Sequence, residues 1–404
     1  MSNNSFAAAS EIECDFDGVL MRPFDPCDHD LDANFRLTRF ADLSERTKKM
    51  PKDVHSKVMS VEQPRGEPEA KGQKETMPEP EPQQPKIALD ISARGSVFTK
   101  PTPLFGDLQL VQATDFGYPI IDDPYLMGKI ACANVLGEMY AKGVVACDNM
   151  LMLLAVSTHM TEKERDTILP IMMRGFKDCA MKAGVNVTGG QSVVNRWCIV
   201  GGVATSVCKE IEIIQPNKAV PGDVLLLTKP LGTHVALNLH KWMTADGDKW
   251  KFLKHSFSEE EVGKAHSMAV KSMCRLNRIT AQLMHKYGAH GAIAIAEHGL
   301  LGHAETLAAC QQNDVALSIC NMPVINRMSS VATQCGDSFQ LMRGRCPEHS
   351  GGLLICMDRE ASIEFCKEMI TMEGPSARSW IIGIVANGDK TVNFSKQRVI
   401  DVNI

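Results

Sequence analysis

Asp122-Asp-Pro-Tyr-Leu-Met-Gly-Lys-Ile-Ala-Cys-Ala-Asn-Val-Leu-Gly-Glu-Met-Tyr140 is the stretch that decides the fold class, because it predicts a helix between two strands. The Asp-Asp-Pro sequence favours helix initiation, with Pro124 at the first helical position. The apolar residues continue to Tyr140, and Gly143 is expected near the helix end.

Strand-like sequences lie on both sides of this helix. Residues 108–114 predict a strand with Leu108, Leu110 and Val111 as candidate core positions. Residues 150–156 are apolar throughout and predict a buried strand. The chain therefore begins its globular part with alternating strands and helices.

The same alternation continues to the C-terminus. Thr161 and Glu164 form a candidate capping box for a helix that runs to about Ala183. Interleaved strands and helices indicate an α/β (α+β) fold. Further strands are expected at 197–205, 224–228, 352–357 and 380–385, and further helices at 259–287, 300–312 and 359–372.

Composition excludes several classes of protein. The net charge of −5 makes nucleic acid an unlikely partner, and no apolar run approaches the roughly 20 residues that span a bilayer. The N-terminus lacks the basic and apolar parts of a signal peptide. The 14 cysteines include no Cys-x-x-Cys pair. These features predict a cytoplasmic protein with reduced thiols and without membrane or nucleic-acid partners.

Composition also suggests the domain organisation. Residues 64–85 are rich in Pro and Glu and poor in apolar side chains, which predicts a disordered linker. A second break in composition lies near residues 215–220. The expected parts are a mobile N-terminal segment (1–63), the linker (64–85), an N-terminal ATP-binding-type domain (86–215) and a C-terminal α/β domain (216–404).

Several long motifs, in this order, resemble those of the eukaryotic, insect-type selenophosphate synthetases (selenide, water dikinases). They are Tyr118-Pro-Ile-Ile-Asp-Asp-Pro-Tyr-Leu-Met-Gly-Lys-Ile-Ala-Cys-Ala-Asn-Val-Leu136, Thr188-Gly-Gly-Gln-Ser-Val-Val-Asn195, Leu227-Thr-Lys-Pro-Leu-Gly-Thr233, Gly291-Ala-Ile-Ala-Ile-Ala-Glu-His-Gly-Leu-Leu-Gly-His-Ala304, Ser350-Gly-Gly-Leu-Leu-Ile-Cys356 and Trp380-Ile-Ile-Gly-Ile-Val385.

The resemblance implies a fold and a reaction. The fold would be the two-domain aminoimidazole ribonucleotide synthetase type, dimerised through a shared β-barrel. The family reaction converts ATP, selenide and water to selenophosphate, AMP and phosphate with Mg²⁺. ATP and Mg²⁺ are therefore the expected cofactors, and the expected partner is a second copy or a family paralogue.

Some family site residues have matches in this chain. Lys49 matches the catalytic family Lys, and Asp90 and Glu138 match two acidic magnesium positions, with Glu in place of Asp at 138. The remaining matches are to nucleotide-binding positions. They are Ala88, Leu89, Asp115, Gly189, Gly190, Gln191 and Ser192.

Other family positions have changed. Arg46 stands where active enzymes carry selenocysteine or Cys, and Arg offers no thiolate or selenolate. The loop glycines and adjacent Cys around it are also lost, and Ala88 replaces a family glycine. Ala294 stands at the third magnesium-binding Asp, where a methyl group cannot hold a cation. Glu297 is a candidate substitute for the lost carboxylate.

These differences lead to three hypotheses. The chain is a selenophosphate synthetase-like protein with lost or strongly reduced catalysis, or an active ATP-dependent phosphotransferase or ATPase with altered metal use. The third hypothesis is an ATP-binding regulatory partner of an active paralogue.

Overall fold

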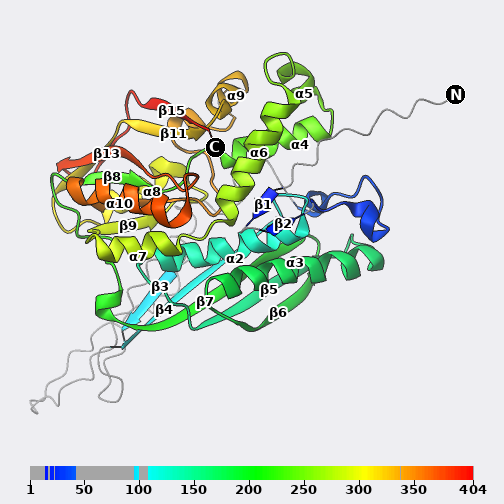
Figure 1. Cartoon of the computed structure of the whole chain (residues 1–404), viewed down its shortest axis with the longest axis horizontal. Helices are drawn as coiled ribbons and strands as arrows, with labels where there is room; N and C mark the ends of the chain where they lie inside the picture. Colours follow the sequence, from blue (N-terminus) through cyan, green and yellow to red (C-terminus); the bar gives the residue numbers. More distant parts are fainter. Residues whose placement is uncertain are drawn as a thin grey trace, which may run out of the picture.

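The computed structural model describes residues 14–16, 19–21, 23–41, 95–99, 108–336 and 338–403. Two sheet-and-helix units lie side by side, one built from residues up to 209 and one from residues beyond 223 (Figure 1). Five predicted site residues lie outside the described ranges, so their positions stay predictions. They are Arg46, Lys49, Ala88, Leu89 and Asp90.

The first unit is a five-stranded sheet in the order β3-β4-β7-β5-β6. Only the β5–β6 pair is parallel, and the two long helices α2 and α3 cover one face (Figure 1). The elements are β3 (Gly95–Thr99), β4 (Leu108–Gly117), α2 (Pro124–Ala141), β5 (Asn149–Ser157), α3 (Glu162–Lys182), β6 (Val187–Asn195) and β7 (Ile199–Lys209).

The second unit is a six-stranded sheet in the order β14-β10-β13-β8-β12-β9, with β11 and β15 paired beside it. Its strands are β8 (Val224–Leu227), β9 (Gly291–Ala294), β10 (Val315–Ile319), β11 (Asn321–Ile325), β12 (Leu353–Met357), β13 (Trp380–Asn387), β14 (Val392–Asn393) and β15 (Arg398–Val402). Its helices are α4 (Thr233–Thr244), α5 (Asp248–Leu253), α6 (Glu259–Cys274), α7 (Arg278–Lys286), α8 (Gly299–Ala309), α9 (Met328–Gln334) and α10 (Arg359–Glu373).

The predicted helix starts of the first unit are confirmed. The Asp123 carboxylate caps α2 by accepting a hydrogen bond from the Leu126 N–H at 2.9 Å. Thr161 and Glu164 form the predicted capping box of α3, because each side chain accepts the other's backbone N–H. Gly143 follows α2 with a left-handed backbone, as its position suggested.

The predicted core positions of β4 are partly wrong. Val111 is fully buried, but Leu108 and Leu110 are exposed. Successive side chains of a strand point to opposite faces, so Val111 shares its face with Ala113 and Asp115. Helix α2 packs on that face, and the described helices leave the face of Leu108 and Leu110 uncovered.

One further prediction needs correction. Residues 188–192, part of a motif in the sequence, lie inside β6 itself. The predicted helix 259–287 is two helices, α6 and α7, separated at Arg275. Arg275 adopts an extended backbone, and its guanidinium donates hydrogen bonds to the Thr228 carbonyl and to Glu373. Tertiary hydrogen bonds thus compensate the helix break.

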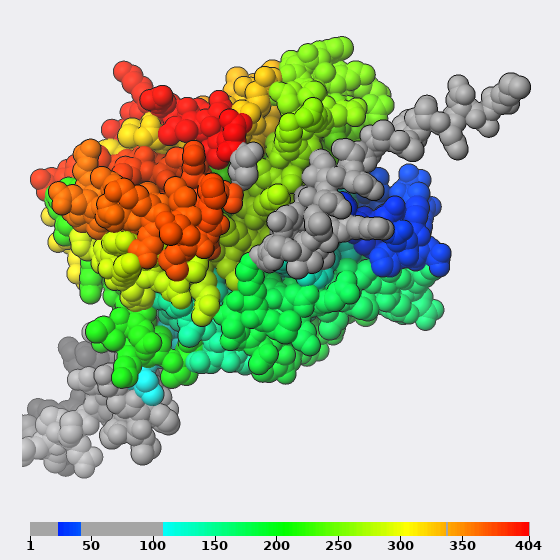
Figure 2. Space-filling view, in the orientation of Figure 1, coloured from blue at the N-terminus to red at the C-terminus, as the bar shows by residue number. Residues whose placement is uncertain are grey.

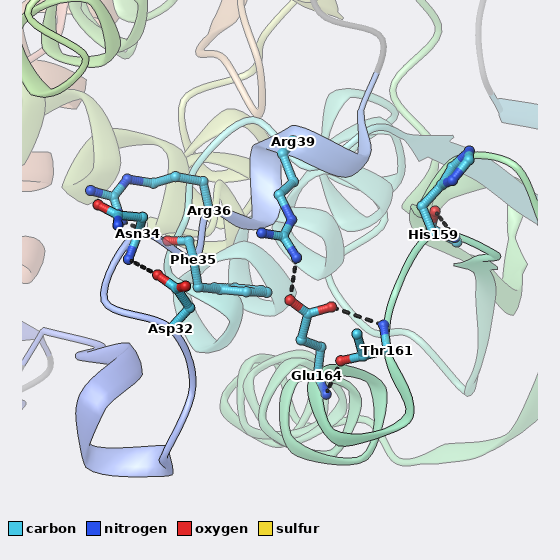
Figure 3. Close-up of polar contacts among 9 residues, drawn as sticks. Asp32, Asn34, Phe35, Arg36, Arg39, His159, Thr161 and Glu164 are labelled. Atoms are coloured by element: carbon cyan, nitrogen blue, oxygen red, sulfur yellow. Dashed lines mark hydrogen bonds and ion pairs between the residues drawn. The ribbon is translucent and has the colours of Figure 1, made fainter.

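Residues 23–41 of the N-terminal segment pack against the first unit. The segment buries Phe35 and Leu37, and in Figure 2 it forms the blue surface beside the green helix α3. Figure 3 shows Arg39 donating a hydrogen bond to Glu164, the same carboxylate that caps α3. Asp32 accepts the Asn34 N–H at 2.7 Å within the segment.

Across the described part of the chain, the search for a helix with the length and apolar character of a membrane span finds none.

Candidate functional site

Asp115 is buried between the first sheet and helix α2. It is 5% exposed and lies on the inner face of β4 with Val111 and Ala113. Its carboxylate accepts a hydrogen bond from the Asn134 amide of α2. The strand alternation therefore directs a predicted nucleotide-binding acid towards the helix and away from the uncovered sheet face.

Asn134 also contacts the second unit. Its carbonyl oxygen accepts a hydrogen bond from the Ser350 N–H at 3.0 Å. Ser350 has a left-handed backbone, and a Cβ added at the following Gly351 would meet the Ile295 carbonyl oxygen at 2.3 Å. The Ser-Gly-Gly sequence before β12 thus allows this loop to approach both helix α2 and the segment after β9 closely.

Ala294 ends strand β9 beside the same loop. It pairs with Leu353 of β12, and the next residue, Ile295, donates a hydrogen bond to the Gly352 carbonyl at 2.9 Å. Helix α2 contacts both β4, which carries Asp115, and β9, which ends at Ala294. The structure therefore gathers two of the predicted site positions around one helix.

Glu138 follows Asn134 on the same face of α2. Side chains one turn apart on a helix have Cβ atoms roughly 5–6 Å apart. Glu138 is buried, so the helix carries an acid and an amide towards the region where the two units meet.

The described residues do not by themselves fit a magnesium ion. No group of three or more His, Cys, Asp or Glu side chains in the described ranges is arranged to hold a metal. Magnesium prefers about six oxygen ligands in near-octahedral geometry. Ala294 supplies no side-chain oxygen, and the Asp115 carboxylate is already hydrogen-bonded to Asn134.

Gly189, Gly190, Gln191 and Ser192 lie apart from this cluster. In the ladder, Asp115 pairs with Gly202, Gly202 with Met152, and Met152 with Gly190. Three strand spacings of about 4.8 Å separate Asp115 from Gly190 by roughly 14 Å. The four residues are exposed on β6 at the sheet edge, so one chain does not bring them into contact with Asp115.

The glycine pair in β6 also has a structural explanation. Gly190 has φ 152°, and a Cβ there would meet the Met152 carbonyl oxygen at 1.9 Å. Gly202 approaches β5 in the same way, with the Leu151 carbonyl oxygen 2.5 Å from an added Cβ. Both glycines therefore allow a close approach of neighbouring strand backbones.

Three residues near the site escaped the sequence reasoning: Asn134, Lys229 and Glu348. Lys229 is fully buried, and its ammonium donates to the carbonyls of Arg275 and Ser350 at 2.7 and 2.8 Å. Burial lowers the pKa of Lys229. Asn134 and Lys229 lay inside recognised motifs, but no spacing signal marked their contacts with Ser350.

Glu348 caps helix α4 from a distant part of the chain. Its carboxylate accepts the Gly232 and Thr233 N–H groups at 2.6 and 3.1 Å, together with the Thr233 hydroxyl. Burial raises the pKa of Glu348 to about 7, although these hydrogen bonds favour the charged form. The N–H of Glu348 donates to the Ala296 carbonyl, which connects this cap to the segment after Ala294.

Comparison with known proteins identifies the class of fold. Family models for the AIR synthase related protein match the N-terminal domain at residues 102–208 and the C-terminal domain at residues 220–394. The structure of hydrogenase maturation protein HypE in complex with ATP is similar to this one, with a TM-score of 0.51 and 15% sequence identity. The match covers 69% of this chain and 77% of the HypE chain. E. coli HypE matches with a TM-score of 0.53 and 16% identity over 73% of this chain and 85% of that chain.

Sequence relatives identify the family within that class. Selenide, water dikinase 3 of Danio rerio is 45% identical over 93% of this chain and 88% of its own length. Selenide, water dikinase 2 of Homo sapiens is 44% identical over 94% of this chain and 87% of its own length. Selenide, water dikinase 2 of Drosophila melanogaster is 37% identical over 94% of this chain and 100% of its own length. The chain therefore belongs to the selenide, water dikinase family and is selenophosphate synthetase-like.

Proposed function

We propose that this protein is a selenophosphate synthetase-like protein with lost or strongly reduced catalysis that retains nucleotide contact. The observation that carries the proposal is Ala294. It lies at the end of β9, a strand that contacts α2, and α2 carries Glu138 and packs on the strand β4 that carries Asp115. Replacing a carboxylate by a methyl group removes on the order of 4 kcal/mol of attraction for a cation at about 4 Å and an effective dielectric of 20.

ATP as a ligand is supported by the family membership and by the ATP complex of the related HypE fold. In this chain Asp115 and the β6 segment that includes Gly189 and Gly190 are the described candidates for nucleotide contact. The two family matches also support a division of the chain near residues 215–220.

A dimer through the first sheet is part of this proposal. Leu110 of β4 and Val207 of β7 form a cross-strand pair on the uncovered face, with 38% and 53% exposure. Exposed apolar side chains gathered on one sheet face favour a protein contact. A partner sheet over this face would bury them.

An ATP turnover assay tests the proposal. The full chain is incubated with ATP, Mg²⁺ and selenide under reducing conditions, and ³¹P NMR follows selenophosphate, AMP and phosphate. A relative that forms selenophosphate in the same buffer is the positive control. We expect no selenophosphate above background from this chain, and formation at the rate of the relative would overturn the proposal.

The same samples distinguish the alternatives. Phosphate release from ATP without selenophosphate would favour an ATPase with altered metal use. ATP binding in calorimetry without turnover would favour an ATP-binding regulatory partner, whose paralogue can then be sought by co-purification.

A further inference from the structure

A cavity lies at the N-terminal end of helix α2, away from Glu138. It encloses about 510 Å³ where residues 23–38 meet the helices α2, α3, α4 and α6. Asp123 at the start of α2 lines it, whereas Glu138 lies roughly 20 Å further along the helix. The cavity is therefore separate from the Ala294 site, and its volume is that of a small-molecule site.

Two histidines form part of its wall. His240 of α4 and His266 of α6 stack with ring centroids 3.9 Å apart and planes at 19°. Neither imidazole makes a hydrogen bond with another described residue. Burial lowers the pKa of both side chains, that of His266 to about 3, so both rings are neutral at pH 7. Each neutral ring offers one donor and one acceptor nitrogen.

The ring geometry excludes a shared metal ion. A metal-binding lone pair lies in the plane of its imidazole ring and points outward from the nitrogen. Planes only 19° apart in a stack therefore hold their lone pairs nearly parallel, so they do not converge on one ion. An organic ligand remains the better fit for this wall.

Charge around the cavity favours a cation. Four carboxylates line it, those of Asp25, Asp28, Asp122 and Asp123, against the two cations Arg174 and Lys241. The Arg174 guanidinium lies over the Tyr125 ring at 5.5 Å. Asp28 forms neither a hydrogen bond nor an ion pair with its side chain to any other described residue, so its charge is available to a ligand.

Apolar and aromatic side chains complete the wall. Leu237, Val270 and Ile171 line the cavity, and Phe24 stacks on His29 at 5.2 Å. Flat rings pack well against such surfaces, and a cation is attracted to an aromatic face.

We propose that this cavity binds a small organic cation with an aromatic body, in which an N–H of the ligand ring donates to the imidazole pair and the cationic group faces Asp28. This site does not depend on the proposed function, because none of the residues at the Ala294 site lines it.

Calorimetry with two matched probes tests the inference on the full chain at low salt. Tryptamine carries an indole ring and an ammonium group, and indole-3-propionate carries the same ring and a carboxylate. We expect tryptamine to bind one site per chain at least about tenfold more tightly than indole-3-propionate. Equal affinities, or no heat with tryptamine at millimolar concentration, would overturn the proposal.

Two variants place the binding in this cavity. Asp28→Asn should weaken tryptamine about threefold and leave indole-3-propionate unchanged or tighter. Asp246→Asn makes the same charge change at an exposed residue outside the cavity and should leave tryptamine binding unchanged.

His266→Phe keeps an aromatic ring in the stack but removes both nitrogens, so it should also weaken tryptamine. Thermal unfolding checks that each variant is folded. If the His266→Phe variant is not folded, the Asp28→Asn variant still tests the site, because Asp28 is exposed. Wild-type tryptamine affinity in a folded Asp28→Asn variant would contradict the assigned site.

Discussion

The Asn134 side chain accepts the Ser350 N–H at 3.0 Å and donates to Asp115, so one amide joins β4, α2 and the loop before β12. Segments of the two units that are far apart in the sequence therefore meet at this amide. This contact lies in the loop that precedes β12, the strand that pairs with Ala294 of β9.

Asn134→Ala should lower the free energy of unfolding by about 1–3 kcal/mol, because it removes a hydrogen-bond partner from the buried Asp115 carboxylate and from the Ser350 N–H. Urea unfolding followed by circular dichroism measures the change. Asn238→Ala is the matched control, since among the described residues that amide donates to the His234 carbonyl within its own helix α4. Equal losses in both variants would contradict a special role for Asn134.

Ala294→Asp should destabilise the chain by about 1–3 kcal/mol without metal, because a carboxylate replaces a side chain that is only 7% exposed. If the metal position is otherwise intact, Mg²⁺ will recover part of this loss, since binding to the folded state stabilises it. Thermal unfolding with and without Mg²⁺ measures the recovery.

Ala292→Asp is the control for this experiment, because it makes the same change at a buried position of the same strand. We expect Mg²⁺ to stabilise the Ala294 variant and neither the control nor the wild type. If Mg²⁺ stabilised the wild-type chain as strongly as the Ala294→Asp variant, the alanine at position 294 would not weaken metal binding.

Glu348 should make stability depend on pH. Its pKa is raised to about 7 in the folded state, so between the ordinary pKa and 7 the folded chain holds a proton that the unfolded chain has released. Stability is therefore highest below the unfolded pKa and falls as pH rises through 7, with a total change on the order of 3 kcal/mol.

Glu348→Gln should remove this fall, because Gln keeps an acceptor for the Gly232 N–H but does not titrate. Denaturant midpoints between pH 5 and pH 8 measure the effect. A variant with the same pH slope as the wild type would assign the slope to other groups.

Val207→Asp should weaken self-association about tenfold or more, because the proposed dimer would bury a charge on the uncovered sheet face. Sedimentation equilibrium measures the association. Met173→Asp introduces the same charge at an exposed apolar residue of α3, on the helix side of the unit, and should leave association unchanged. A wild-type chain that is monomeric at high concentration would refute the dimer.

Local chemistry explains which structural predictions were correct. The Asp123 and Pro124 start of α2 and the Thr161 and Glu164 capping box depend on residues a few positions apart, so the sequence suffices to predict them. The helix break at Arg275 depends on partners at Thr228 and Glu373, which no local pattern contains.

The sequence by itself determined the alternation of strands and helices and the family, and it predicts the loss of a metal-binding carboxylate at Ala294. Only the tertiary structure decided which face of β4 is buried, that residues 188–192 form an edge strand, and that Asn134 joins Asp115 to Ser350. The physical reason is that periodicity and capping act over a few residues, whereas burial and site geometry depend on which distant segments pack together.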